Sequence, residues 1–205
     1  MPEINGERLL QLTYDTEKRA NSFYNNQMLD HLNKDMREFV AKQEMVFIST
    51  ADSKGNCDAS FRSGTEGFVR IMDEHTIMYP EYRGNGVMAS LGNIVENPHI
   101  GLLFLDFIET GIGLHINGEA SILENEQMNS WIHDEEFMAE IKAKEGIKPE
   151  RWVVIKVEEA YIHCSKHIPQ FKKLPKDIQW GTDEEAQKGG DFFKVKQVKN
   201  NIPFK

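Results

Sequence analysis

Between residues 45 and 164 the chain consists mainly of short β-rich segments joined by tight turns. MVFISTA (45–51) and CDASF (57–61) flank the turn-forming sequence DSKGN, and GFVRIMD (67–73) and TIMYP (76–80) repeat this arrangement. Neighbouring parallel strands need crossover connections of about a dozen residues or more, and most of these connections are far shorter. The pattern therefore predicts antiparallel hairpins and excludes βαβ units for most of the chain.

Three later segments extend the β-rich region. HIGLLFLDF (99–107) is apolar at almost every position, as in a strand covered on both faces. LHINGEASIL (114–123) alternates strictly between apolar or small residues and polar ones, which predicts a half-buried strand. WVVIKVEEAYIHC (152–164) is the last strong strand. Six or more strands with one short helix between them predict a mainly β fold with flanking α-helices, in the form of an antiparallel barrel.

Helical periodicity is found in four places. We expect helices over about Glu7–Tyr24 and Asp30–Gln43, and a short one that begins near Val87 and stops at Asn97-Pro98. A fourth helix is expected from about Glu126 to Lys144. The sequence after Pro169 is rich in Lys, Gly and Asp and has only a weak pattern.

A chain of 205 residues suits one sizeable domain with additions at its ends. The expected organisation is an N-terminal helical segment (1–44), a barrel domain (45–169) with a helical insertion near 126–144, and a C-terminal tail (170–205).

The charge balance bears on the choice of partner. Acidic residues outnumber basic ones by 33 to 24, which gives a net charge of −9. Such a surface repels nucleic acid and anionic lipid, so neither is the expected partner. The two cysteines lie far apart, the N-terminus is charged and lacks an apolar leader, and the longest apolar run (100–105) is too short to cross a bilayer. We expect a cytoplasmic protein.

Arginines near strands and turns are the informative basic residues in this acidic chain: Arg62, Arg70 and Arg83. Arg83 precedes Gly84-Asn85-Gly86, where glycines allow close backbone approach and Asn85 is placed to cap a helix that starts near Val87. Free N–H groups at a helix start together with a guanidinium are typical of a phosphate site. The alternatives are a surface loop with a solvated charge and, for Arg70, an outward-facing strand residue.

Several common nucleotide and hydrolase motifs are absent. The chain has no GxxxxGK[ST] phosphate loop and no GxSxG nucleophile elbow. GIGLHING (111–118) differs from GxGxxG and leads into a strand instead of a helix. A phosphate site near Arg83 would therefore belong to another class of fold.

The stretch His163-Cys164-Ser165-Lys166-His167 closes the last predicted strand and has four possible interpretations. Cys164 with a neighbouring histidine is a weak zinc signal, because a second pair of ligands is missing, and we predict no metal site. A Cys–His nucleophilic pair lacks an orienting third group. Lys166 and His167 could instead reach a ligand cleft, or the stretch is a strand end with a buried cysteine.

The order of segments over residues 51–104 resembles the pyridoxamine 5'-phosphate oxidase-like family of FMN-binding split barrels. The specific marks are YRGN, then ENP followed by an apolar strand, and the late HCSKHIP, so that the resemblance runs from about Asp35 to Pro169. It implies a six-stranded antiparallel split β-barrel. It also implies a homodimer with FMN bound in clefts at the subunit interface.

The resemblance also implies cofactor contacts. Arg62 matches the family's strand arginine, Arg70 the basic residue on the next strand, and Tyr79 with Pro80 an aromatic–hydroxyl pair. Arg83 and its neighbours match the phosphate-binding turn. The full set of implied cofactor-binding residues is Arg62, Val69, Arg70, Tyr79, Pro80, Arg83, Gly84, Asn85, Lys166 and His167.

Two departures from the family pattern limit the implied activity. The chain lacks the Arg-Leu-x-Asp-Arg type of ending that grips substrate phosphate in authentic pyridoxamine-phosphate oxidases, and the family's flavin-contacting glutamine is replaced near Gly113. FMN binding is implied, but oxidation of vitamin B6 is not. We expect an FMN-dependent oxidoreductase with a small-molecule substrate, hydride transfer through flavin N5 and no assigned catalytic side chain. The alternative is a non-catalytic flavin-, deazaflavin- or haem-binding protein on the same barrel.

Overall fold

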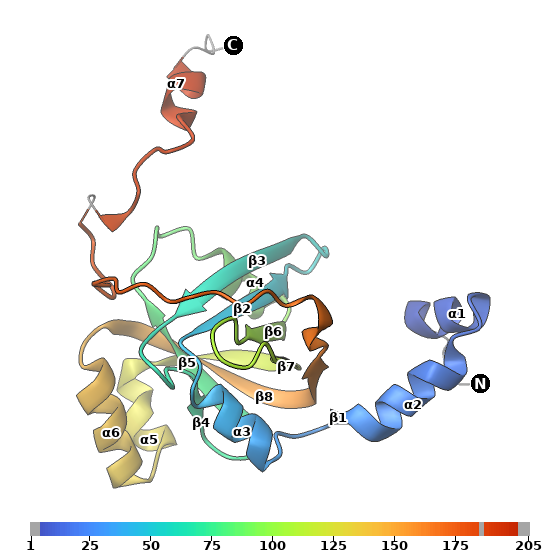
Figure 1. The fold of residues 1–205 in the computed structure, drawn as a ribbon. Helices are drawn as coiled ribbons and strands as arrows, with labels where there is room; N and C mark the ends of the chain where they lie inside the picture. Colours follow the sequence, from blue (N-terminus) through green and yellow to red (C-terminus); the bar gives the residue numbers. More distant parts are fainter. Residues whose placement is uncertain (1–4, 185–186, 201–205) are drawn as a thin grey trace.

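The computed structural model describes residues 5–184 and 187–200 (Figure 1). The predicted N-terminal segment and tail therefore each include positions outside the described residues, namely 1–4 in the first and 185–186 and 201–205 in the second.

The described chain is built around one antiparallel sheet in the order β3-β2-β6-β7-β8-β5-β4, with β1 paired to β8. Its strands are β1 (Met28–Leu29), β2 (Met45–Ala51), β3 (Cys57–Ser63), β4 (Arg70–Ile71), β5 (Thr76–Tyr82), β6 (His99–Leu105), β7 (Gly113–Glu124) and β8 (Pro149–His163). The predicted antiparallel sheet is confirmed, but the six-strand count is wrong: the sheet has eight strands, of which β1 and β4 are only two residues long. Within the described residues β3 does not pair with β4, so the sheet is open rather than a closed barrel.

Local turn chemistry explains the β2–β3 hairpin. The two strands pair from Met45↔Ser63 to Ala51↔Cys57. In the connecting turn the Asp52 carboxylate accepts hydrogen bonds from the Lys54 N–H (2.9 Å) and the Asn56 N–H (2.8 Å). An aspartate that bonds its own turn in this way favours a tight reversal. The predicted hairpin is confirmed.

The predicted strand over 67–73 is mostly wrong, because only Arg70 and Ile71 pair with β5. Gly67 has φ +72°, and its N–H bonds to the Gln43 carbonyl instead of a neighbouring strand. Phe68 and Val69 are buried, but they are packed rather than paired. The apolar pattern that predicted a strand here comes from core packing around a turn.

Helices are found in the four predicted regions but are shorter than expected there, and one further helix, in the tail, was not predicted. They are α1 (Gly6–Thr13), α2 (Glu17–Gln27), α3 (Lys34–Val40), α4 (Ala89–Glu96), α5 (Met128–Trp131), α6 (Glu135–Glu145) and α7 (Val195–Asn200), with 3-10 turns η1 (Asn125–Gln127) and η2 (Ser165–His167). The single helix expected over Glu7–Tyr24 breaks at Asp15, where φ is +52°. The helix expected over 126–144 is two helices, because Asp134 caps a new start by accepting the Phe137 N–H at 3.0 Å.

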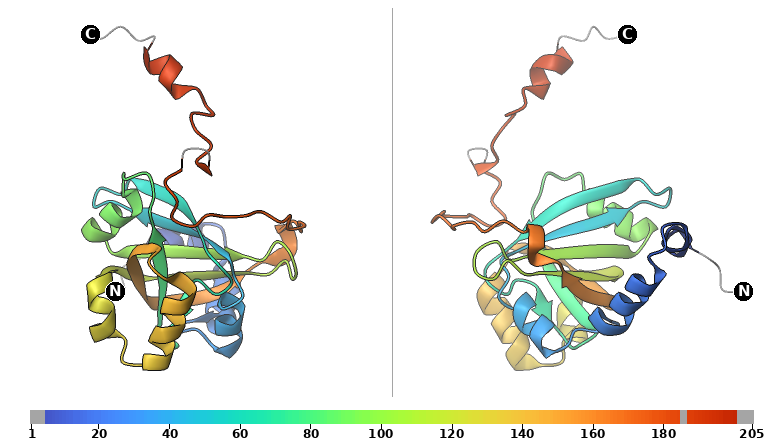
Figure 2. Two further views of the ribbon diagram at one scale, coloured as in Figure 1. Left: turned by 90° about the vertical axis from the view of Figure 1, so that its left-hand side faces the viewer. Right: turned by 45° about the vertical axis from the view of Figure 1, so that its right-hand side comes forward.

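Two hydrophobic clusters form the core between the sheet and the helices. The larger cluster fills the inside of the curved sheet, where β7 presents alternate residues such as Leu114 and Ile116, as its sequence pattern predicted. The smaller one packs α5 and α6 against the sheet around Met78 and Trp152. Figure 2 shows α5 and α6 together at one end of the sheet and α4 near β3. No helix in residues 5–184 and 187–200 is long and apolar enough to span a membrane.

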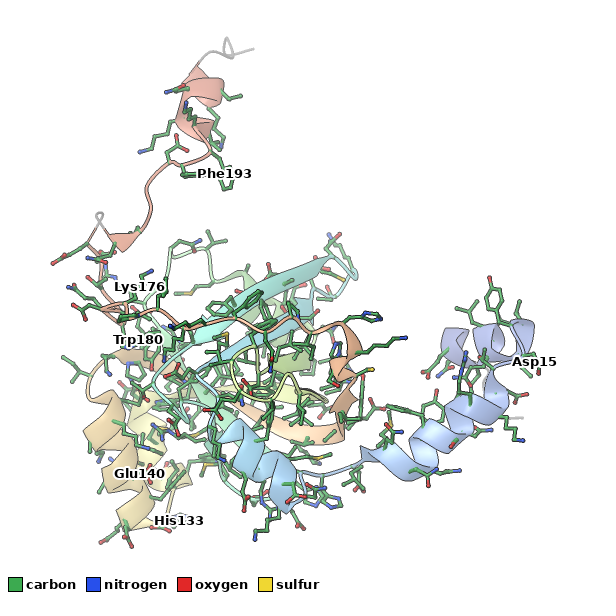
Figure 3. All side chains as sticks on the ribbon, viewed as in Figure 1. Asp15, His133, Glu140, Lys176, Trp180 and Phe193 are labelled. Carbon is green, nitrogen blue, oxygen red and sulfur yellow. The ribbon has the colours of Figure 1, made fainter. Side chains whose placement is uncertain are left out.

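The tail after η2 returns across the sheet before it leaves the body (Figures 1 and 3). It is fixed at its start by a hydrogen bond from the Phe171 N–H to the Phe107 carbonyl (2.6 Å) and by contact of the two phenyl rings, whose centroids are 5.2 Å apart. Phe107 belongs to the turn between β6 and β7. The geometry of that turn therefore sets where the tail begins.

Asp106 organises this turn. Its carboxylate accepts the N–H groups of Ile108 (3.0 Å), Glu109 (3.0 Å) and Thr110 (2.9 Å) and the Thr110 hydroxyl (2.6 Å). Partial burial raises the pKa of Asp106, but the hydrogen bonds outweigh this and bring the pKa down to about 2.

Asp106→Ala should lower the free energy of unfolding by about 1 kcal/mol near pH 7, after allowance for the partial solvent screening of the carboxylate. Because the folded pKa lies below the unfolded one, this stability is complete above about pH 5 and fades as the pH falls towards about 2. Urea unfolding at about pH 7 and about pH 3 measures the difference. Asp177→Ala is a matched control, since the exposed Asp177 side chain makes no hydrogen bond to another described residue. An equal loss at both pH values would contradict the assignment.

Candidate functional site

A cleft of about 980 Å³ lies between β3, the loop from β5 to α4, and the tail. Along β3 the side chains of Asp58, Ser60 and Arg62 share the half-buried face, while Cys57, Ala59 and Phe61 on the other face are exposed. The period of two along a strand explains this division. The cleft is completed by residues 81–91, by Glu150 and Arg151 of β8, and by residues 178–183 with Gln187 and Lys188.

Arg62 is held by a buried carboxylate at the edge of the cleft. Its Nε donates to Glu81 Oε1 at 2.8 Å, and its Nη1 donates to Ser60 Oγ at 2.6 Å. Burial raises the pKa of Glu81, and the Arg62 guanidinium works in the opposite direction. Arg62 is thus fixed in direction, and much of its charge is balanced by its own chain.

The loop after β5 presents Arg83 and its neighbours to the same cleft. Asn85 Oδ1 accepts the Val87 N–H at 3.0 Å, and α4 begins only at Ala89 after Met88, whose φ is +54°. The expectation that Asn85 caps the helix is therefore wrong: it shapes the loop before the helix. No side chain among the described residues caps α4, so its first N–H groups have no side-chain acceptor, and residues 88–91 at its start line the cleft with Arg83. Such groups attract anions.

The tail supplies the opposite wall of the cleft. Asp183 Oδ2 lies 2.9 Å from Arg83 Nη2, and Lys188 also pairs with Asp183. The rings of Trp180 and Tyr82 are 5.9 Å apart. Figure 3 labels Trp180 beside the body of the protein. These tail residues were not predicted to belong to the site, because neither Trp180 nor Asp183 lies in a local motif that would identify it.

Tyr79, Pro80 and Val69 lie in the interior and do not line the cleft. The Tyr79 side chain is fully buried, and its hydroxyl has no hydrogen-bond partner among the described residues. Burial raises the pKa of Tyr79, with the Glu81 charge adding to this effect. An unpaired buried hydroxyl beside Arg62 and Glu81 is a position that an additional polar group would stabilise.

Arg70 also lies away from the cleft. Its Nη2 is 3.0 Å from Glu145 Oε1 on α6, and the two side chains are 4% and 1% exposed. The Tyr82 hydroxyl donates to the other Glu145 oxygen at 2.6 Å. Arg70 is neither solvated nor available to a ligand in this chain, because the buried Glu145 carboxylate balances its charge.

Lys166 and His167 form the exposed turn η2 after β8, and they do not line the cleft with Arg62 and Arg83. Just before this turn, His163 Nδ1 and His115 Nε2 are 2.8 Å apart. Burial, with help from His163, lowers the pKa of His115. Cys164 is exposed, and no group of three or more potential ligands for a metal is found among the described residues.

Solved structures to which the chain is similar include proteins from several bacteria. HupZ of Group A Streptococcus is 22% identical, with 64% of this chain and 93% of HupZ covered and a TM-score of 0.46. An FMN-binding protein from Syntrophomonas wolfei is 13% identical, with 77% and 97% covered and a TM-score of 0.41. HutZ, a haem storage protein from Vibrio cholerae, is also 13% identical, with 64% and 94% covered and a TM-score of 0.40. No curated protein matches the chain.

The family comparison covers strands β2 to β8 and the part of the cleft that they and the β5–α4 loop form. The model of the family described as pyridoxamine 5'-phosphate oxidase matches residues 32–164, well over half of the chain. The matched region runs from just before α3 to the end of β8, and it includes Arg62, Arg83 and the start of α4. The chain belongs to the pyridoxamine 5'-phosphate oxidase-like family.

Proposed function

We propose that this protein is an FMN-binding oxidoreductase whose cofactor phosphate binds at Arg83 and the start of α4. The observation that carries the proposal is that Arg83 and the residues of an uncapped helix start line one cleft. A guanidinium and free N–H groups are the donors that a phosphate dianion prefers. Family membership supports FMN as the phosphate-bearing ligand.

The cleft fits a ligand of nucleotide size. Its volume of about 980 Å³ is at the upper end of the range for small-molecule sites. Gly84 has open space around the position of a Cβ, so its backbone is accessible to a ligand. Arg62 would contribute hydrogen-bond direction more than net charge, because Glu81 is already its partner. Arg83 therefore has the larger share of the proposed phosphate binding.

The proposal keeps Arg62, Arg83, Gly84 and Asn85 as cofactor contacts. It assigns no direct side-chain contact to Val69, Arg70, Tyr79 or Pro80, which are buried in the single chain. We further propose that Lys166 and His167 meet the cofactor across the interface of a homodimer. The exposed Phe47 and Phe61, whose rings are 5.5 Å apart on β2 and β3, support such an interface.

Bound FMN would supply hydride or electron transfer at flavin N5. The protein's part is to bind and orient the cofactor and to restrict water around it. No side chain is assigned as an acid or base. The small-molecule substrate would reach the cofactor from the open side of the cleft. We also propose a reducing, cytoplasmic location, which the free thiols of Cys57 and Cys164 support and cell fractionation would test.

The test begins with the visible spectrum of the purified protein and mass spectrometry of any ligand that heat releases. Apoprotein is then titrated with FMN, and the loaded protein is mixed anaerobically with NADH and with NADPH in a stopped-flow instrument. Rapid bleaching of the flavin is the expected result. Tight FMN binding with no reduction by any donor would favour a non-catalytic flavin protein, and a released deazaflavin or haem would replace FMN as the cofactor. Failure to bind FMN would overturn the proposal.

A further inference from the structure

The tail between residues 178 and 183 forms part of the cleft wall, although it follows the region that defines the family match. The tail as a whole contacts the body at several points along its length. Lys173 pairs with Glu44 on the body, and farther along Trp180 contacts Tyr82. The Tyr82 ring is itself held in place by the hydrogen bond from its hydroxyl to the buried Glu145. These contacts give the tail a defined course along the body before it leaves it (Figures 1 and 3).

A turn in the tail directs Asp183 towards Arg83. The Thr182 N–H bonds to the Gln179 carbonyl at 3.2 Å, and Gly181 has φ +73°, a conformation that favours glycine. Immediately after the turn, Asp183 Oδ2 lies 2.9 Å from Arg83 Nη2. The Asp183 carboxylate thus pairs with Arg83, the residue that binds the cofactor phosphate in the proposed function.

This ion pair is easily exchanged. The Arg83 and Asp183 side chains are 56% and 54% exposed. Exposed pairs contribute little to stability, because both ions remain well hydrated when they separate. A phosphate dianion offers Arg83 more charge and more acceptor oxygens than a carboxylate does. A neutral ligand offers neither, and would leave the pair intact.

We propose that Asp183 is an internal counter-ion of Arg83 that a ligand phosphate must displace, so that it lowers the affinity of the cleft for phosphate-bearing ligands and leaves the affinity for neutral ligands unchanged. A phosphorylated ligand displaces the Asp183 carboxylate from Arg83, and Lys188 remains beside Asp183 as its second partner. A ligand of the same ring structure without the phosphate gains nothing from Arg83. The inference rests on the proposed function, because it takes Arg83 as the phosphate ligand.

The test compares FMN with riboflavin, which carries the same ring without the phosphate. Asp183→Asn removes the competing charge, and it should tighten FMN binding about two- to five-fold while riboflavin binding stays unchanged. Asp177→Asn makes the same change of charge on the same tail, at an exposed residue that does not line the cleft, and should alter neither affinity appreciably. Fluorescence titration of the full-length apoprotein measures each dissociation constant.

A double-mutant cycle locates the effect. In an Arg83→Ala background, Asp183→Asn should no longer tighten FMN binding, since the counter-ion then has no arginine to occupy. If the wild-type protein binds FMN and Asp183→Asn leaves its affinity unchanged, or shifts riboflavin equally, the inference is wrong while the proposed function stands. If the wild-type protein does not bind FMN, the proposed function fails and the inference fails with it.

Discussion

Replacing Arg70 by methionine should lower the free energy of unfolding by about 3–5 kcal/mol. The change leaves the Glu145 carboxylate, which is 1% exposed, without its ionic partner 3.0 Å away. The Tyr82 hydroxyl alone would then remain as a donor to this buried charge. Urea unfolding followed by circular dichroism measures the loss through the midpoint, provided that the slope of the transition is unchanged.

Two further variants show whether the stability loss of Arg70→Met comes from leaving a charge buried without a partner. Arg70→Met combined with Glu145→Leu should recover much of the lost stability, because replacing both members of a buried pair by apolar residues removes the uncompensated charge. Lys144→Met removes a neighbouring but exposed pair with Glu140, where the Nζ–Oε1 distance is 2.9 Å, and should cost less than about 1 kcal/mol. A loss for Arg70→Met no larger than that for Lys144→Met would contradict this account.

The ion pair of Arg70 could not be predicted from the residues near it in the sequence. An arginine within an apolar β-rich segment suggested either a solvated strand face or a cofactor contact. Its actual partner, Glu145, is 75 residues away on α6. Nothing near Arg70 in the sequence indicates this pairing, because it depends on how α6 packs against β4 and β5. The same packing gives Tyr82 its place at the cleft.

The β2–β3 hairpin and the faces of β7 were predictable because their information is local. Asp52 and Gly55 form the β2–β3 turn within a few residues, and the alternation along β7 reflects its two faces directly. The helix breaks at Asp15 and Asp134 were missed, since apolar residues occur on both sides of each break. A capping aspartate in the middle of such a pattern was the available signal for the second break.

The cleft was predictable only in part. Arg62 and the Arg83 loop lie in the family-like region, and the structure gathers them around one cleft, as expected of a shared site. Lys166 and His167 are not brought to them within one chain, and any meeting would need a second subunit. The tail was missed because Trp180 and Asp183 make contacts that depend on the path of a segment with little periodicity.

Arg83→Ala should weaken FMN binding about 10- to 100-fold, because one or more charge-assisted hydrogen bonds to phosphate, each contributing about 1.5–3 kcal/mol, are lost. Stability should hardly change, since the Arg83 side chain is 56% exposed and its ion pair with Asp183 lies at the surface. Fluorescence titration with FMN measures the affinity, and thermal unfolding of the same samples measures stability. Arg83→Lys should restore part of the affinity, as a point charge replaces a bidentate donor.

Arg19→Ala is the matched control, because Arg19 is an exposed arginine on α2 that does not line this cleft. It removes the same charge from the protein, so any loss of affinity that it shares with Arg83→Ala is a long-range effect of net charge. The loss of affinity that is specific to Arg83→Ala should become smaller as salt is added. It should be absent for riboflavin, which has no phosphate. An equal loss for riboflavin would mean that Arg83 acts on the flavin ring or on the shape of the loop. The start of α4 would then have to bind the phosphate without this arginine.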